Sequence, residues 1–398
     1  MNGTMSTKSV HAGENRKKAH NSLTTPIVLS STFPFENTAE ILDFKANNTS
    51  SIHGRLEYGR YGNPTVRAAE MKLAALDNAE RALLFSSGMN AITTTLLALL
   101  SSGDHLVMVC PVYRRSLEFT DFLSRWGIET SLVESNDFDK LRTALKPNTR
   151  LIFAETPSNP TLRVLDLELL VRIAQEAGVL TMVDSTFATP INLRPLELGV
   201  NLVIHSATKY LGGHNDLLAG SAAGKTDLLQ KIQDARNVLG GILSPMDAYF
   251  LLRGIKTLAL RVQKQNQNGQ LVAEFLENHP LVKRVHYPGL PAHPDHAVAR
   301  KLMKGSGGVV SFEIDGSKET ASTVIDNLEL PYIGPTLGGV ESIAQQQALL
   351  LSSDPDTRKA SGIPDQLIRY ALGIEDAEDI IADLDQAMEK AAAAELKT

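Results

Sequence analysis

The sequence predicts an α/β protein with a doubly wound, largely parallel sheet. Between residues 81 and 205, apolar runs of strand length alternate with stretches of helical length and periodicity. Polar or charged side chains directly follow several of these runs. Because ligands of such sheets collect beyond the carboxyl ends of the strands, the same pattern predicts a binding site at one edge of the sheet.

Each element of that sheet is predicted from local signals. Apolar and β-branched runs mark the strands, and Gly, Asn and Ser punctuation separates them from helical stretches. The expected strands are 81–85, 105–110, 150–154, 179–183 and 202–205. The expected helices are 63–77, one that follows a turn at 86–90 and reaches 100, 116–127, 138–144 and 167–177.

Weaker patterns flank this region. Residues 1–57 show little periodicity, and such a long irregular arm is expected to pack on a partner subunit. We expect a cofactor-binding domain at 58–250 and a smaller C-terminal α+β domain at 251–398. A long linking helix is expected over 248–278, strands over 308–314 and 328–332, and a closing helix over 378–395.

Composition excludes several classes of function. A net charge of -6 argues against nucleic acid or an anionic membrane as the main partner. Cys110 is the only cysteine, so no internal disulfide can form, and no metal site is expected. The N-terminus is polar and no apolar run reaches transmembrane length, which predicts a cytoplasmic protein.

The most informative stretch is 201–215, where a buried strand delivers Lys209 into a polar turn. A desolvated ammonium is costly, and condensation with an aldehyde removes its charge, as in enzymes that hold pyridoxal phosphate (PLP) on a lysine. Ser206 and Thr208 flank the lysine and suit a phosphate. A single lysine after a strand is more often a surface residue, so this interpretation depends on other motifs.

Two further segments are suited to phosphate binding. Tyr58, Arg60 and the Gly-Asn-Pro turn after them carry several hydrogen-bond donors. Ser86-Ser-Gly-Met89 opens an apolar helix, whose first N–H groups attract anions. Each signal alone also fits an ordinary loop or cap. Several strand ends nevertheless supply polar groups to the same edge: Tyr113, Glu155 with Asn159, and Asp184 with Thr186, besides the Lys209 turn.

Taken together, the motifs resemble the Cys/Met-metabolism group of PLP-dependent enzymes. The resemblance rests on Ser206–Asn215, Asp184–Pro190, Tyr58-x-Arg-x-x-Asn-Pro-Thr65 and Ser86–Met89, and it extends over nearly the whole chain. It implies the aspartate-aminotransferase fold (fold type I), with a large parallel or mixed sheet and a smaller C-terminal domain. It also implies a dimer with shared active sites that pairs into a tetramer.

The resemblance assigns a role to each candidate. Lys209 would carry PLP as a Schiff base and move the substrate proton, Asp184 would keep the ring nitrogen protonated, and Tyr113 would stack on the ring. The remaining cofactor contacts would be Ser87, Gly88, Met89, Ser206 and Thr208 at the phosphate, Tyr58 and Arg60 from the neighbouring subunit, and Asn159 and Thr186 near the ring. Arg369, Thr336 and Arg114 would bind the substrate amino acid.

Four further segments most resemble the cystathionine γ-synthases, especially those of plants: Arg236–Pro245, Tyr287–Pro291, Val309–Ile314 and Pro331–Pro335. This similarity implies γ-replacement on an activated homoserine, with cysteine as the incoming thiol. The chain departs from the family at Gln345-Gln-Gln, Thr336 and Ala371, where the family shapes its substrate pocket. A γ-lyase acting on canavanine, cystathionine or methionine therefore stays open.

Two other classes are weaker alternatives. A PLP-holding regulatory protein with little turnover would not need the full set of Lys209, Asp184, Tyr113 and Arg369. A nicotinamide-dependent oxidoreductase would need a Gly-x-Gly-x-x-Gly turn, and Ser86–Met89 lacks that pattern.

Overall fold

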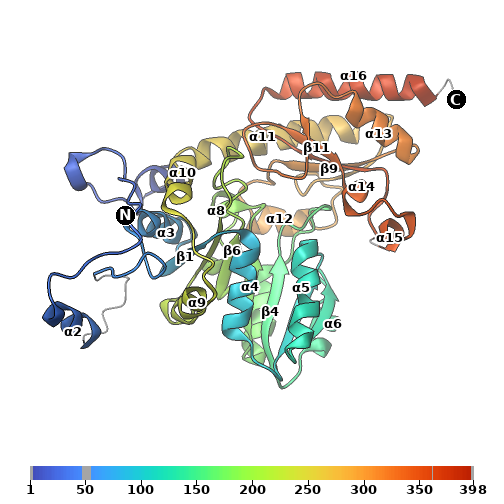
Figure 1. Ribbon diagram of the computed structural model, residues 1–398. Helices are drawn as coiled ribbons and strands as arrows, with labels where there is room; N and C mark the ends of the chain where they lie inside the picture. The colour runs from blue at the N-terminus through green and yellow to red at the C-terminus, as the bar shows by residue number, and fades with distance from the viewer. Residues whose placement is uncertain (1–2, 47–54, 361, 396–398) are drawn as a thin grey trace.

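A mixed seven-stranded sheet, in the order β1-β7-β6-β5-β4-β2-β3, forms the centre of the larger part of the molecule (Figure 1). The computed structural model describes residues 3–46, 55–360 and 362–395 of the 398-residue chain. β2 to β6 pair in parallel, whereas β7 runs antiparallel to both β1 and β6. The strands are β1 (Arg81–Phe85), β2 (His105–Cys110), β3 (Glu129–Glu134), β4 (Thr149–Glu155), β5 (Leu180–Asp184), β6 (Leu202–His205) and β7 (Gly220–Gly224).

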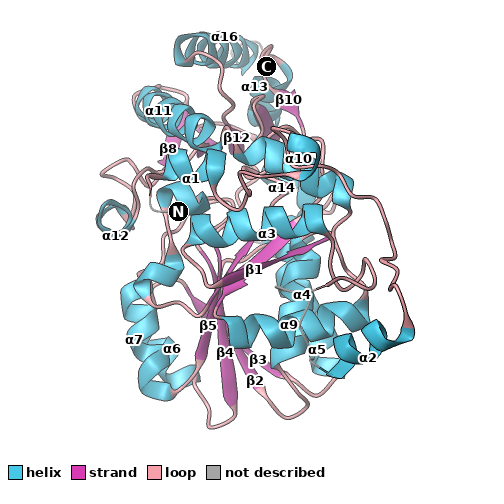
Figure 2. Cartoon of the chain, turned by 90° about the vertical axis from the view of Figure 1, so that its left-hand side faces the viewer, coloured by secondary structure: helices cyan, strands magenta, loops and turns pink. Residues whose placement is uncertain are grey.

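Helices cover both faces of this sheet, as Figure 2 shows with α6 and α7 on one side and α4, α5 and α9 on the other. Side-chain caps start several of them: Asn63 accepts from Thr65 N, and Asp166 accepts from Leu169 N. The helices are α3 (Pro64–Asp77), α4 (Gly88–Leu99), α5 (Arg114–Arg125), α6 (Phe138–Ala144), α7 (Leu167–Ala177), α8 (Thr189–Asn192) and α9 (Thr226–Leu239).

The C-terminal part is built on a five-stranded sheet in the order β10-β11-β12-β9-β8. A continuous apolar cluster joins it to the larger part, since Leu73, Leu251 and Phe312 all belong to it. The strands are β8 (Val282–His286), β9 (Val309–Ile314), β10 (Tyr332–Ile333), β11 (Ile343–Gln346) and β12 (Leu367–Ala371). The helices are α10 (Pro245–Ile255), α11 (Leu258–Glu277), α12 (His296–Leu302), α13 (Lys318–Asp326), α14 (Gln347–Leu351), α15 (Pro355–Ala360) and α16 (Ala377–Glu395).

Two expected elements were wrong in their bounds. The single helix expected over 248–278 is two helices, because Arg261 donates to Thr257 Oγ1 and to the carbonyl of Gly254 and so holds a break between α10 and α11. The strand expected over 328–332 is limited to β10. The carboxylate of Asp383 accepts from the N–H groups of Glu329 and Leu330, which takes them out of a strand ladder.

The N-terminal arm is mostly irregular, as expected, but it carries the short helices α1 (Met5–His11), η1 (Ala19–Asn21) and α2 (Thr38–Ala46). Positions 1–2 and 47–54 of the expected arm lie outside the described residues. The buried Lys72 of α3 anchors the arm through the carbonyls of Ser9 and Val10 and an ion pair with Glu14. Further along the arm, Pro26 and Val28 are bonded to Thr65 at the start of α3, whereas α2 lies well away from the sheet (Figure 1).

Candidate active site

The predicted gathering of polar groups at the carboxyl ends of the strands is present. Glu155 ends β4 and lies opposite Asp184, which ends β5, and Asp184 lies opposite Ile204 of β6. Directly after that strand, Ser206 begins a turn in which its carbonyl accepts from Lys209 N–H. Parallel pairing of neighbouring strands therefore brings the two carboxylates and the lysine to one edge.

Lys209 is held as an amine with a lowered pKa. Its Nζ donates a 2.9 Å hydrogen bond to Thr336 Oγ1. Burial, reinforced by the positive charge of Arg369, lowers the pKa of Lys209 from 10.5 to about 8. Lys209, Thr208 and Thr336 line an open pocket that Leu217 and Leu218 border. A ligand in this pocket would therefore meet an amine that is readily neutral and nucleophilic.

Asp184 is a buried carboxylate with fixed oxygens. One oxygen accepts from Thr186 N at 3.0 Å and from Thr186 Oγ1 at 2.5 Å. Thr186 Oγ1 in turn accepts from Ser206 N at 2.8 Å, which couples β5 to the Lys209 turn. Burial raises the pKa of Asp184 above its usual range. Among the described residues, the positively charged group that acts on Asp184 is His205 rather than a Lys or Arg, so a cationic nitrogen of a ligand would relieve the cost of burying the carboxylate.

The start of α4 lies against the turn that follows β6. Ser87 caps the helix by accepting from Asn90 N, which leaves the first N–H groups, at Gly88 and Met89, without partners inside the helix. A Cβ at Gly88 would lie 2.8 Å from Cβ of Ser206, so only glycine permits this approach. The hydroxyl of Ser206 and the helix N-terminus thus face the same space, which suits an anion. The hydroxyl of Thr208 is already bonded to the backbone of Ala219.

A second group of side chains at the site consists of Tyr113, Asn159 and Arg369. Glu155 accepts from Tyr113 N at 2.6 Å and from Asn159 N at 3.1 Å. Arg369 of β12 donates to Asn159 Oδ1 at 3.3 Å and to the Thr336 carbonyl at 2.9 Å. Arg369 is almost completely buried, and burial lowers its pKa from 12.5 to about 10. This cation points to a ligand with a carboxylate.

Three predicted residues lie apart from this group. Tyr58, directly after the N-terminal arm, is 43% exposed, and Arg60 donates to the carbonyl of Asn237 near the C-terminal end of α9. Arg114, at the start of α5, is paired with Glu118 at 3.4 Å and donates to the carbonyl of Leu351 at 3.2 Å. Within one chain, these side chains therefore do not reach Lys209.

The segment Gln345-Gln-Gln347, which departs from the family pattern, adjoins Arg369. Gln345 is the cross-strand neighbour of Arg369, and its amide donates to Gln347 Oε1. The Oε1 atom of Gln345 is buried and has no partner among the described residues. The neutral amide of Gln345, bonded to that of Gln347, thus belongs to the strand next to the buried cation.

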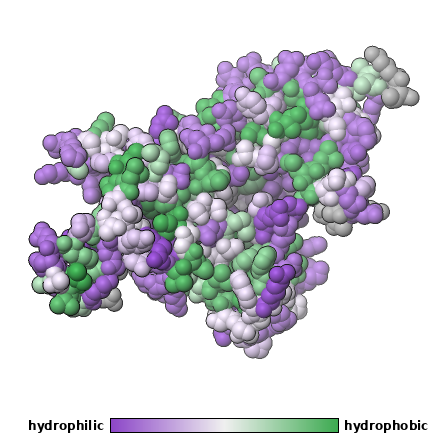
Figure 3. All heavy atoms as spheres, in the orientation of Figure 1, coloured by the Kyte–Doolittle hydropathy of each residue, from purple (hydrophilic) through white to green (hydrophobic). Residues whose placement is uncertain are grey.

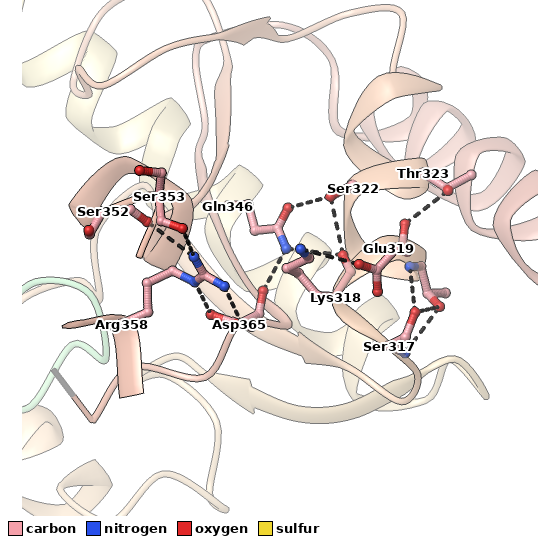
Figure 4. A network of polar contacts seen from close by, with 11 residues as sticks. Ser317, Lys318, Glu319, Ser322, Thr323, Gln346, Ser352, Ser353, Arg358 and Asp365 are labelled. Atoms are coloured by element: carbon pink, nitrogen blue, oxygen red, sulfur yellow. Dashed lines mark hydrogen bonds and ion pairs between the residues drawn. The ribbon is translucent and has the colours of Figure 1, made fainter. Parts of the chain in front are cut away.

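A polar network holds the rest of this segment in place (Figure 4). Gln346 donates to the carbonyls of Lys318 and Asp365 and accepts from Ser322 Oγ. Arg358 pairs with Asp365 at 2.8 Å. This network ties α14 to the second sheet and to α13. α14 carries Leu351, whose carbonyl accepts from Arg114.

Sequence reasoning did not find every residue that shapes the site. It placed Glu155 at this edge without a function, because a glutamate that ends a strand has no distinctive signal. It also missed Arg261, whose buried guanidinium holds the carbonyl of Tyr210 next to Lys209 at 2.7 Å. An isolated arginine in a long helical pattern gives no indication of such a contact.

These residues fit PLP. Lys209 supplies the amine, and Asp184 supplies a buried, unpaired carboxylate for the ring nitrogen. The N-terminus of α4, with Ser206 against Gly88, supplies a cradle for the phosphate. Tyr113 is 45% exposed and stands above the same edge, so its ring is free to cover a flat ligand.

No helix in the described ranges is both long and apolar enough to cross a membrane. The family described as "Cys/Met metabolism PLP-dependent enzyme" matches residues 6–389. The chain is 46% identical to the chloroplastic cystathionine gamma-synthase 1 of Arabidopsis thaliana over 387 residues, which cover 96% of this chain and 68% of that protein. It is 44% identical to the cystathionine gamma-lyase of Bacillus subtilis (strain 168) over 341 residues, which cover 85% of this chain and 89% of that protein.

A solved structure described as metB from Corynebacterium glutamicum matches with a TM-score of 0.89 and 35% identity, and covers 98% of each chain. This likeness confirms the expected fold class, a PLP-dependent transferase of fold type I. The chain therefore belongs to the Cys/Met metabolism family of PLP-dependent enzymes, and its cofactor is pyridoxal phosphate.

Proposed function

We propose that the chain catalyses γ-replacement on an O-activated L-homoserine with cysteine as the acceptor, as a cystathionine γ-synthase does. One observation carries the proposal: Thr336 binds Lys209 through its hydroxyl and Arg369 through its carbonyl. An amino acid held by its carboxylate at Arg369 would therefore have its Cα proton near the amine of Lys209. The 46% identity to a plant cystathionine gamma-synthase supports the choice of reaction.

In this mechanism, PLP supplies an electron sink that stabilises negative charge at the substrate Cα. Arg369 binds the substrate carboxylate and fixes its orientation. Lys209, whose neutral form is accessible because burial lowers its pKa to about 8, takes the Cα proton, passes that proton on, and only then, neutral again, takes a Cβ proton. Thr336 directs the Nζ of Lys209. Asp184 holds a proton at the ring nitrogen, and the ring of Tyr113 excludes water from one face. Loss of the γ-substituent then opens Cγ to a thiol.

A γ-lyase is the second candidate. The 44% identity to a cystathionine gamma-lyase favours it. Such an enzyme would release the γ-substituent of cystathionine, methionine or canavanine without a thiol acceptor.

One experiment separates these candidates. The PLP-loaded protein is incubated with O-phosphohomoserine, an O-acylhomoserine, cystathionine, methionine or canavanine, with and without cysteine, and products are identified by mass. Cystathionine that forms only from the activated homoserines with cysteine supports the synthase. A keto acid or homoserine formed without cysteine supports the lyase, and no turnover of any substrate supports a PLP-binding regulatory protein.

A homodimer with shared sites, paired into a tetramer in the cytoplasm, completes the proposal. Large apolar side chains are exposed on the arm and near α9, among them Leu23 (90%), Leu29 (67%) and Val238 (84%). Green apolar residues gather over the arm, at the left of Figure 3, and over the middle of that face. A second copy covering them would bring Tyr58 and Arg60 to the partner's phosphate. Within each copy we propose an arm at 1–57, a cofactor domain at 58–250 and a C-terminal domain at 251–398.

A further inference from the structure

We propose that Glu155 is a positioning residue: one buried carboxylate that fixes, through two backbone N–H groups, both the residue that covers the cofactor ring and the residue that meets the ring hydroxyl. The inference rests on the site proposed above, because it takes Tyr113 and Asn159 as contacts of PLP. Glu155 itself touches neither cofactor nor substrate.

The geometry is that of a clamp. Glu155 Oε2 accepts from Tyr113 N at 2.6 Å, and Oε1 accepts from Asn159 N at 3.1 Å. Tyr113 is the residue before α5: its carbonyl accepts from Ser116 N and Leu117 N of that helix, and the Glu155 carboxylate holds its N–H on the side of the site. Because the two bonds use different oxygens, the positions of the two residues are set relative to each other.

The clamp continues to the substrate. Asn159 Oδ1 accepts from Arg369, the residue proposed to bind the substrate carboxylate. Displacing the backbone of Asn159 would therefore also displace a partner of the buried guanidinium. Glu155 thus connects the position of the ring with the position of the amino acid.

A carboxylate is costly at this position, which argues that it is needed. Burial and the neighbouring Asp184 both raise the pKa of Glu155 well above its usual range, and the two N–H donors oppose that shift. A glutamine of the same size would avoid the repulsion, but its amide accepts through only one oxygen and would point NH2 at a donor. Only a carboxyl group can serve Tyr113 and Asn159 together.

The test compares PLP-loaded wild type with Glu155→Gln, Glu155→Asp and the control Glu313→Gln, which removes a carboxylate bonded to His286 in the second sheet. For Glu155→Gln we expect the visible circular dichroism of bound PLP to fall by about half and the PLP Kd to rise about tenfold, as for one lost hydrogen bond to a charged group. KM for the amino acid should rise by a similar factor. Glu155→Asp retains both acceptor oxygens on a shorter side chain, so its dichroism, PLP Kd and KM should lie between those of wild type and Glu155→Gln. Glu313→Gln should match wild type in all three.

A cofactor analogue that lacks the ring hydroxyl tests separately the effect that Glu155 exerts through Asn159. If Glu155 acts through that contact, Glu155→Gln should weaken binding of the analogue by a smaller factor than binding of PLP. Equal factors for the two cofactors would overturn the inference. So would a Glu155 variant of unchanged Tm whose dichroism and PLP Kd stay within twofold of wild type. These readouts do not depend on which amino acid is turned over, so a wrong substrate assignment leaves the test intact.

Discussion

Arg369 Nη1 donates a 3.3 Å hydrogen bond to Asn159 Oδ1, although the two residues lie 210 positions apart, one in the five-stranded sheet and one in a loop that follows a strand of the seven-stranded sheet. Asn159 follows β4 of the seven-stranded sheet, and Arg369 is in the middle of β12 of the five-stranded sheet. The site is therefore complete only when the seven-stranded and five-stranded parts of the molecule pack against each other.

The buried guanidinium should control substrate affinity. Replacing Arg369 by Lys keeps a positive charge but removes the fork that binds both oxygens of a carboxylate. We expect KM for the amino acid to rise roughly 30- to 100-fold, equivalent to about 2–3 kcal/mol, with a smaller loss in kcat. Steady-state kinetics measure both KM and kcat. Arg163→Lys is the control, because that arginine pairs with Asp295 away from the site. An unchanged KM would remove Arg369 from substrate binding.

Attachment of PLP to the cofactor-free protein should depend on the protonation of Lys209. Its pKa is lowered to about 8, so the neutral fraction rises about tenfold per pH unit below 8 and levels off above it. The rate at which the visible absorbance appears should follow that curve. Arg369→Met removes a like charge, raises the pKa of Lys209 and should move the curve to higher pH, whereas Arg369→Lys should leave it in place. A curve that moves to lower pH in Arg369→Met would contradict the electrostatic cause.

The sequence predicted the strands of the cofactor sheet well where a strand is buried and apolar. The expected strands 81–85, 105–110 and 202–205 match β1, β2 and β6. It did not predict β3, whose face is polar, or β7, whose Gly-Ser-Ala-Ala-Gly has no β-branched residue and is a strand only because β1 and β6 pair with it. Tertiary pairing overrides propensity there.

For the site, local motifs were sufficient for residues near a strand end, and insufficient for contacts between distant segments. Lys209, Asp184 and Tyr113 end or follow parallel strands of one mixed sheet, so strand order alone brings them together. The bond of Lys209 to Thr336 depends on how the second sheet packs, which no local pattern encodes. The clamp at Glu155 was missed for the same reason, because its two donors come from different loops.

The buried pair of His205 and Asp77 should make stability depend on pH. Burial by itself lowers the pKa of His205, but the Asp77 carboxylate, 3.0 Å away, raises it above its ordinary value. Stability from a raised pKa is fully present below pH 6.5 and is lost as pH rises through the folded-state value. Asp77→Asn should therefore cost about 3 kcal/mol in urea unfolding at pH 6 and less at pH 9. Equal costs at the two pH values would contradict a charged pair.

Arg114 should favour substrates with an anionic γ-substituent. Arg114 directly follows Tyr113, and its guanidinium is half exposed and bonded to Glu118 and the Leu351 carbonyl. For Arg114→Gln we expect the preference for O-phosphohomoserine over O-acetylhomoserine, as a ratio of kcat/KM, to fall about fivefold, the size expected of a solvent-screened charge. Arg125→Gln, at the other end of α5, is the control. An unchanged ratio would exclude Arg114 as the determinant.

If Arg60 serves the partner's active site, two inactive variants should complement each other. Lys209→Ala lacks the amine in its own site, and Arg60→Ala lacks the phosphate contact that it gives to the other site, since Arg60 lies with Asn237 rather than with Lys209 in its own chain. A mixed dimer would contain one site with both residues intact. Refolding the variants together in equal amounts should restore about a quarter of wild-type activity, because about half of the dimers are mixed and each has one good site of two. Mixtures no more active than the average of the separate variants would place Arg60 in the site of its own chain.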